Sequence, residues 1–267
     1  MLQLAELRRF LESFAPPGLS EDWDNVGLLV GDGGKQLQRV MTCLTITPAS
    51  CAEAVGKGTD LIVSHHPLPF KPLRRLTTES TPGRLLLELI QAGIAVYSPH
   101  TAFDSAAEGI NQQLAEGIGL VEIRPLVLSP SPSGMAEQLG SGRSGRFAAP
   151  LALKEIAQRL KAFLKIQGLH AVGSGDAAIS TAALACGSGG SFLEHAVEQG
   201  IDLLITGEAS FHTCLEAEAS GVNMLLAGHF ASERFAVERL AEVIGRAFPK
   251  LTVWSSSDEA DPLRWIS

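Results

Sequence analysis

Residues 54–66 read Ala-Val-Gly-Lys-Gly-Thr-Asp-Leu-Ile-Val-Ser-His-His, and this stretch decides the fold class. A helix end with a glycine cap at Gly58 is followed by a short apolar run at 61–63, which has the length and composition of a buried strand. Such runs alternate with helical patterns along the whole chain. Strands are predicted at 26–30, 40–46, 61–63, 94–97, 166–172, 179–185, 203–205 and 222–226, and helices at 4–14, 49–57, 82–92, 151–164, from 191, at 211–219 and from 231. This alternation predicts an α/β protein with an at least partly parallel sheet.

A second copy of this pattern follows later in the chain. The segment 196–206 repeats Ala-Val-x-x-Gly-x-Asp and the apolar run of 54–64 without a gap. Downstream, His100-x-x-x-Asp104 is echoed by His229-x-x-x-Glu233. Any two helix-strand units could share the first signature, but a second match in the same order favours an internal duplication.

The length of 267 residues suggests one large or two small domains, at roughly 150 residues per domain. The only low-complexity stretch is the Ser-, Pro- and Gly-rich segment 129–144, which is typical of a surface linker. We therefore predict two similar αβ lobes, residues 1–128 and 145–267, joined by a linker at 129–144 and acting as one functional unit.

The charge and the apolar pattern exclude several classes of protein. The net charge is −8 and is spread evenly, so no basic half or tail is available to bind nucleic acid or an anionic membrane. No apolar run approaches the ~20 residues of a membrane span, and the N-terminus lacks the features of a signal peptide. A soluble cytoplasmic protein is the expectation.

The four cysteines are too widely spaced for a zinc-ribbon pattern and are expected to be small buried residues. A metal site must then use histidines and carboxylates, which suit Zn, Fe, Mn or Mg. His65 and His66 directly follow a buried strand, at the end where α/β proteins bind ligands. Adjacent residues leaving a strand point in different directions, so the pair could serve two metals. A hydrogen-bonded surface pair is the alternative.

The second half of the chain adds further metal donors. His229 and Glu233 are spaced i, i+4, so they share one face of the first turn of the last helix. Asp104 takes the position that matches Glu233 in the proposed duplication. Together these side chains are sufficient for a shared dinuclear centre with a bridging carboxylate.

Five blocks of the sequence resemble the signature blocks of a known family, the GTP cyclohydrolase I type 2 homologs, also called NGG-one-interacting-factor-three-like or dinuclear metal centre hexameric proteins. The blocks are Asp24-Asn25-Val26-Gly27-Leu28-Leu29-Val30-Gly31, Asp60-Leu61-Ile62-Val63-Ser64-His65-His66-Pro67, Tyr97-Ser98-Pro99-His100-Thr101-Ala102-Phe103-Asp104, Thr206-Gly207-Glu208 and Gly228-His229-Phe230-Ala231-Ser232-Glu233. The resemblance runs from about residue 4 to residue 266. It implies a toroidal homohexamer of two-lobed subunits, each with two divalent metal ions (Zn, Fe or Mn). The implied ligands are His65, His66, Asp104, His229 and Glu233, with Glu233 as the bridge.

Two departures from the family pattern are visible. An Asp is common in the family near the end of the second strand, where this chain has Thr45-Ile46-Thr47. The role of that carboxylate is therefore open in this chain. The segment 129–144 is also too short to contain the extra domain that larger members carry between the two halves.

Other residues are candidates for substrate contact or proton transfer. His100 lies one helical turn before Asp104 and is an acid/base candidate, or else caps a turn. Gly187, Ser188 and Gly189 could face an anion with their backbone amides, although a tight turn is the favoured interpretation. Glu208 is a candidate for substrate binding, or else a charge at a helix N-terminus. Trp23 lines the mouth of the site or fills core, and the sequence does not decide which.

Two metals with open positions lower the pKa of bound water, so hydrolysis is the default chemistry. The resemblance implies attack on GTP or a related nucleotide, with His100 as the proton carrier. No residue is tied to guanine, and no basic cluster is dedicated to a triphosphate. The alternative is a non-catalytic iron or zinc carrier, or a metal-dependent binding or regulatory protein. A third hypothesis is a dinuclear phosphoesterase that acts on another substrate. The expected partners are copies of the chain itself and a nucleotide, without a membrane or a nucleic acid.

Overall fold

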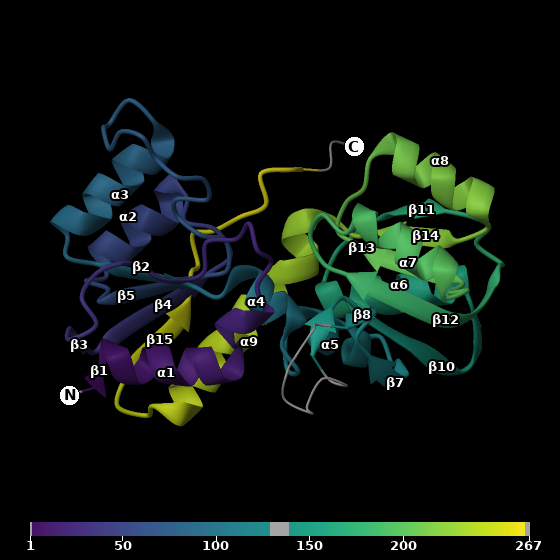
Figure 1. The fold of residues 1–267 in the computed structure, drawn as a ribbon, viewed down its shortest axis with the longest axis horizontal. Coiled ribbons are helices and arrows are strands. Elements are labelled where there is room, and N and C mark those ends of the chain that lie inside the picture. The colour runs from purple at the N-terminus through teal and green to yellow at the C-terminus, as the bar shows by residue number, and fades with distance from the viewer. Residues whose placement is uncertain (1, 129–138, 265–267) are drawn as a thin grey trace. The chain divides into compact units, whose positions relative to one another are not determined.

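The structure is a computed structural model that describes residues 2–128 and 139–264, and it has a mixed α/β fold. The chain forms two units, one made of Met1–Phe103 with Ala236–Ser267 and the other of Asp104–Phe235. The chain passes from one unit to the other within two helices, α4 (His100–Ser105) and α9 (His229–Ala247), which are labelled in Figure 1. Among the described residues, no helix is both long and apolar enough to cross a membrane.

The first unit contains a five-stranded sheet. In spatial order its strands are β15 (Thr252–Ser255), β4 (Arg39–Cys43), β5 (Leu61–Ser64), β6 (Ala95–Ser98) and β2 (Gly27–Val30). Strands β15, β4, β5 and β6 are parallel, and β2 pairs antiparallel with β6. A separate antiparallel pair joins β1 (Leu2–Gln3) to β3 (Gln36–Leu37). The carboxyl ends of β4, β5 and β6 therefore meet at one edge of the sheet.

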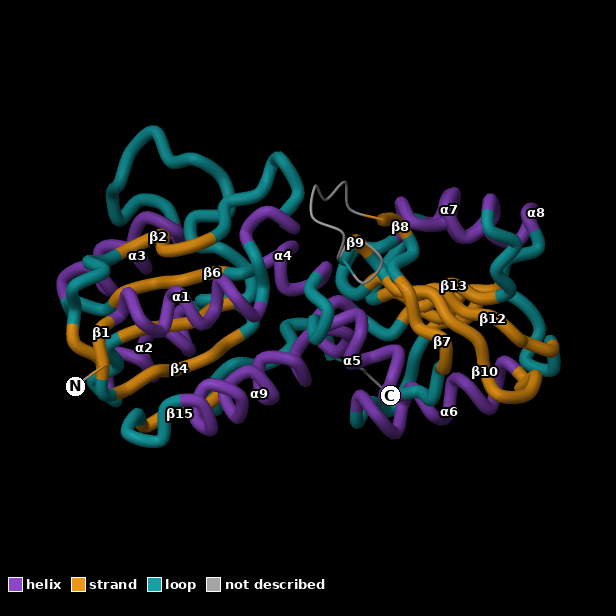
Figure 2. Tube along the Cα trace, turned by 60° about the horizontal axis from the view of Figure 1, so that its bottom comes forward, coloured by secondary structure: helices purple, strands orange, loops and turns teal. Residues whose placement is uncertain are grey.

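Helices cover both faces of this sheet, as Figures 1 and 2 show. On one face, α2 (Pro48–Gly56) and α3 (Thr81–Gln91) bury apolar side chains such as Ala54 and Leu89 against Met41 and Ile62. On the other face lie α1 (Leu4–Phe14) and the end of α9. Phe10 of α1 packs edge-on against Phe248, the residue after α9, with ring centroids 5.3 Å apart. Alternate residues of each strand thus face different helices, as the period of two requires.

The second unit has a six-stranded sheet. Its spatial order is β11 (His170–Val172), β14 (Asn223–Leu226), β13 (Leu203–Thr206), β12 (Ala178–Ala185), β10 (Arg143–Ala152) and β7 (Val121–Arg124). Strands β12, β13 and β14 are parallel, whereas β10, β7 and β11 are antiparallel to their neighbours. A short pair joins β8 (Val127–Leu128) to β9 (Gly140–Ser141).

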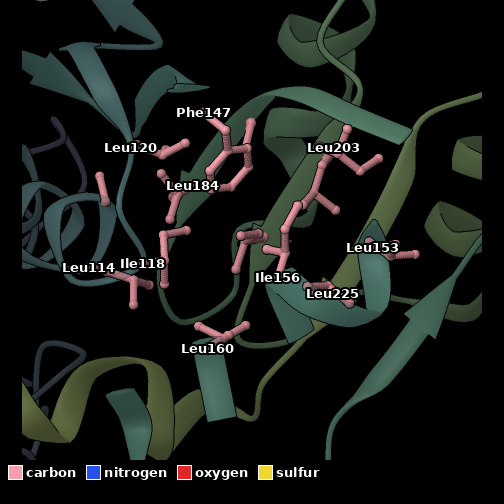
Figure 3. Close-up of a cluster of buried hydrophobic side chains, with 14 of the residues drawn as sticks. Leu114, Ile118, Leu120, Phe147, Leu153, Ile156, Leu160, Leu184, Leu203 and Leu225 are labelled. Carbon is pink, nitrogen blue, oxygen red and sulfur yellow. The ribbon is translucent and has the colours of Figure 1, made fainter. Parts of the chain in front are cut away.

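Two apolar clusters hold this second sheet between layers of helices. One cluster, shown in Figure 3, packs α5 (Ile110–Gly117) and α6 (Leu153–Leu164) against the sheet through residues such as Ile156 and Leu203. The other packs α7 (Leu193–Glu198) and α8 (Phe211–Ser220) through Ala196 and Ala217. Within residues 2–128 and 139–264, two 3-10 turns complete the helices, at Pro17–Leu19 and Gly190–Phe192.

The division of the chain differs from the one predicted from sequence. Residues 104–128 pack with the second unit, because α5 joins its core and β7 pairs with β10. Residues 236–267 pack with the first unit, because β15 pairs with β4. Of the predicted linker 129–144, residues 129–138 lie outside the described residues, while β9 and the start of β10 occupy most of the rest. Periodicity shows that an element has an apolar face, but not which sheet that face covers.

Candidate functional site

The predicted metal ligands form two sets, one in each unit. In the first unit, His65 and His66 follow β5, and His100, the first residue of α4, follows β6. One ring nitrogen from each of the three histidines lies within 4.8 Å of the other two. Three imidazole nitrogens at this separation are a donor set suited to Zn or Fe.

Backbone hydrogen bonds fix the His65-His66 pair at the edge of the sheet. The amide of His65 donates to the carbonyl of Cys43 at 2.9 Å, and that of His66 donates to Leu44 at 2.8 Å. The Ser98 hydroxyl donates to the carbonyl of His65 at 2.6 Å. His65 is buried, so its ring orientation is set by the protein rather than by water.

The side chain of Thr45 orients the second histidine. Its hydroxyl oxygen lies 2.7 Å from Nδ1 of His66. When Nδ1 carries the proton and donates to Thr45, Nε2 is the nitrogen of His66 that carries the lone pair and can bind a metal ion. Thr45 belongs to the Thr45-Ile46-Thr47 segment, where the resembling family commonly has an Asp.

A carboxylate from elsewhere in the chain contacts this same segment. Glu259 accepts hydrogen bonds from the backbone amides of Leu44 and Thr45, at 2.8 and 2.5 Å. These contacts explain why β4 ends at Cys43 although the apolar pattern predicts a strand to residue 46. The amides that would extend the sheet bind a carboxylate instead.

His100 is paired with a carboxylate that sequence reasoning missed. Its Nδ1 lies 2.6 Å from Oδ1 of Asp24, whose side chain is 1% exposed. The other oxygen of Asp24 accepts hydrogen bonds from the amide and the hydroxyl of Thr101. Burial alone would raise the pKa of Asp24, but the hydrogen bonds from His100 and Thr101 outweigh it and lower the pKa to about 2. Asp24 therefore stays ionised and holds His100 with Nδ1 protonated, which leaves Nε2 as the reactive nitrogen.

The second unit contributes mostly carboxylates. His229 begins α9, and its Nε2 lies 3.3 Å from Oε2 of Glu233. Oxygens of Asp104 and Glu233 lie within 4.8 Å of each other. The hydrogen bond to Glu233 outweighs burial and, together with Glu208, raises the pKa of His229 to about 9. A metal ion would take the place of that proton.

Glu208, predicted as a substrate-binding residue, contacts a predicted ligand. Its Oε1 lies 3.0 Å from Nδ1 of His229, which leaves Nε2 on the side of Glu233. A carboxylate on the far nitrogen of an imidazole is a common arrangement around metal ligands, since it fixes the ring and raises its basicity.

The glycine-rich turn packs against these ligands. Gly187 has φ +63°, and a Cβ atom there would lie 2.1 Å from Oε1 of Glu233. The amides of Gly187 and Gly189 already donate to Ser232 and Thr206, each at 2.9 Å. This geometry favours the tight-turn interpretation of Gly187, Ser188 and Gly189 over an anion-binding loop.

Cys186 precedes this turn and remains a thiol. Burial, together with the charges of Asp104 and Glu233, raises the pKa of its thiol well above the usual range. The surroundings therefore disfavour a thiolate at this position.

Comparison with known proteins gives matches over the whole chain. The sequence profile of Duf34/NIF3 (NGG1p interacting factor 3) matches residues 2–262. A "GTP cyclohydrolase 1 type 2 homolog" of Clostridium acetobutylicum is 32% identical over 99% of both chains. A "Protein NIF3 homolog" of Schizosaccharomyces pombe is 36% identical over 97% of this chain and 96% of that protein. The crystal structure of Staphylococcus aureus protein SA1388 superposes with a TM-score of 0.89 at 27% identity, over 99% of both chains.

Proposed function

Because the chain belongs to the Duf34/NIF3 family, we propose that it binds two divalent metal ions through His65, His66, Asp104, His229 and Glu233, and uses them to hydrolyse GTP or a related nucleotide. The observation that carries this proposal is the convergence of donors within each unit. In the first unit, a ring nitrogen of His65 lies within 4.8 Å of one of His66, with the proton-carrier candidate His100 beside them. In the second unit, Glu233 lies near both His229 and Asp104. As the family resemblance implies, we also propose a homohexamer of the 28.2 kDa chain.

We propose further that both ligand sets serve one dinuclear centre, with Glu233 as the bridging carboxylate. Two adjacent imidazoles, His65 and His66, leave their strand in different directions and suit two ions rather than one. The carboxylates of the second unit supply the negative charge that two divalent cations require.

Divalent metal ions bound by these residues would activate water for attack on an electrophilic carbon or phosphorus. His100 is placed to move a proton through Nε2, because Asp24 occupies its other nitrogen. We propose the cyclohydrolase reaction on the basis of the name of the relatives. In that reaction water attacks the guanine ring and formate is released, so formate is the product to measure.

Glu233→Gln tests both the ligands and the activity. The variant keeps the side-chain volume but removes the charge, and we expect it to lose both ions. Wild-type protein loaded with Zn, Mn or Fe should hold two ions per chain by elemental analysis and release formate from GTP. The matched control is Glu242→Gln, an exposed carboxylate on the same helix, which should keep both properties.

Three results would count against this assignment. Retention of two ions by Glu233→Gln would remove that residue as a bridge. Loss of a single ion would indicate separate sites in the two units. Two bound ions without formate release from GTP, combined with rapid transfer to a chelator, would favour a metal carrier.

Thr45→Val should weaken metal binding without unfolding the protein. The substitution preserves shape but removes the hydroxyl beside Nδ1 of His66, and outer-shell partners of this kind contribute roughly 10- to 100-fold in affinity. Competition with a chromophoric chelator measures the change. Thr45→Ser keeps the hydroxyl and should bind like the wild type; equal weakening in both variants would contradict an orienting role.

A further inference from the structure

Two large aromatic side chains lie exposed beside the histidines of the first unit. Trp23 is 65% exposed and Phe70 is 50% exposed. Their ring centroids lie 6.1 Å apart, and both rings contact His100 edge-on, at 5.9 and 5.8 Å. An aromatic pair left in water is unfavourable by itself, so its place next to candidate ligands points to a function.

Hydrogen bonds of the residues next to Trp23 and Phe70 hold the two loops in place. Asp24, next to Trp23, is bound by His100 and Thr101, and the amide of Glu21 donates to the Thr101 hydroxyl at 3.0 Å. The side-chain amide of Asn25 donates to the carbonyl of Pro69, next to Phe70, at 3.0 Å. The two loops are thereby tied to α4 and to each other, so little conformational entropy is lost when a ligand binds.

The geometry of the pair defines how a ligand could pack. The ring planes of Trp23 and Phe70 are inclined at 49° with centroids 6.1 Å apart, which leaves no room for a third ring between them. Both side chains are instead partly exposed to solvent beside His100, and together they make up what we call the aromatic wall. A planar ring can stack on such a wall in an offset arrangement.

Charge around the wall suggests the rest of the ligand. Lys71, Arg74 and Arg75 follow Phe70 within five residues, and all three are exposed. No ion pair within the described part of the chain involves them. This is a local concentration of positive charge in a chain whose net charge is −8. The residues that precede Trp23 are the acidic Glu21 and Asp22. An anionic group is therefore favoured on the side of Phe70.

We infer that Trp23 and Phe70 form an aromatic wall that stacks the planar base of a nucleotide beside His100, with the phosphate directed to Lys71, Arg74 and Arg75. This inference rests on the proposed function and adds the residues that would recognise its substrate. Stacking is tolerant of the base, because every base presents a π face, whereas the basic residues select for phosphate.

Binding of GMP and of ribose 5-phosphate to the metal-loaded full-length protein tests the inference, since the two ligands differ by the base. Trp23→Ala combined with Phe70→Ala should weaken GMP binding by roughly tenfold or more in calorimetry and leave ribose 5-phosphate unaffected. Trp23→Phe, which keeps an aromatic ring at this position, should retain most of the wild-type affinity for GMP. Leu73→Ala, which removes an exposed aliphatic side chain from the same loop, is the control and should change neither ligand. The triple variant Lys71→Gln, Arg74→Gln and Arg75→Gln should weaken the binding of both GMP and ribose 5-phosphate. It should also make the affinity for each ligand less dependent on salt concentration.

Equal affinity of wild-type protein for GMP and ribose 5-phosphate would overturn the aromatic wall, as would an unchanged GMP affinity after both alanine substitutions. Metal content measured on the same samples separates this failure from a failure of the proposed function. Two bound ions with no base-dependent binding contradict only the wall. Base-dependent binding without bound metal supports the wall and contradicts the dinuclear centre.

Discussion

Replacing Arg143 with methionine should lower the free energy of unfolding of the second unit by about 4 kcal/mol. The guanidinium is 1% exposed and donates hydrogen bonds to neutral oxygens only. These are the side chain of Gln112 and the carbonyls of Ser105, Ala106, Gly140 and Gly142. Burial without a compensating carboxylate lowers the pKa of Arg143 to about 10, so the residue is still charged at neutral pH. Methionine fills similar space but leaves those buried carbonyls without their donors.

The effect should be local and independent of pH from about 5 to 8, because both the folded and the unfolded chain keep Arg143 protonated there. Urea denaturation followed by circular dichroism gives the magnitude, and hydrogen exchange should show faster opening around Ser105 and Ala106 at the end of α4. Arg146→Met is the matched control on the same strand, since Arg146 is an exposed residue that pairs with Glu122. Similar losses in both variants would contradict a specific role for the buried guanidinium.

The role of Arg143 is an example of a feature that could not be predicted from the sequence. Helix 4–14 and the strands around 61–63 and 203–205 were predictable, because their apolar periodicity is a local property. The same local pattern identified His65-His66 and the His229, Glu233 spacing as candidate ligands. A buried arginine that binds backbone carbonyls leaves no such signal, because its partners are main-chain atoms.

Contacts between residues that lie far apart in the chain could not be predicted from the sequence either. Asp24 and His100 are 76 residues apart, and nothing in either segment specifies the pairing. Glu259 replaces two ladder hydrogen bonds at the end of β4 from 214 and 215 residues away. The sequence does not indicate whether Trp23 fills the core or lines the site, because a single aromatic residue has no periodicity. These residues support the candidate ligands, and tertiary structure alone brings them together.

Glu53 anchors the C-terminal segment that carries Glu259. Its buried carboxylate accepts hydrogen bonds from Nε1 of Trp254 at 3.1 Å, the Ser256 hydroxyl at 2.6 Å and the Ser257 amide at 3.0 Å. Lys57 adds an ion pair at 2.7 Å. Burial alone would raise the pKa of Glu53, but these partners lower it from 4.5, the ordinary value for a glutamate, to about 2.

Glu53→Gln should therefore cost about 3 kcal/mol of stability at pH 7, and this difference from wild type should disappear in acid. The folded-state pKa is depressed, so the stabilisation is present above pH 4.5 and is lost as the pH falls toward 2. Urea denaturation at pH 7, 4 and 3 should show the wild-type curve approaching that of the variant. Glu79→Gln, at an exposed position, should follow the wild type at each pH. A difference between Glu53→Gln and wild type that stays constant with pH would show that the carboxylate charge is not what stabilises the segment. Because that segment carries Glu259, faster hydrogen exchange at the amides of Leu44 and Thr45 should accompany the loss and connect this anchor to the orientation of His66.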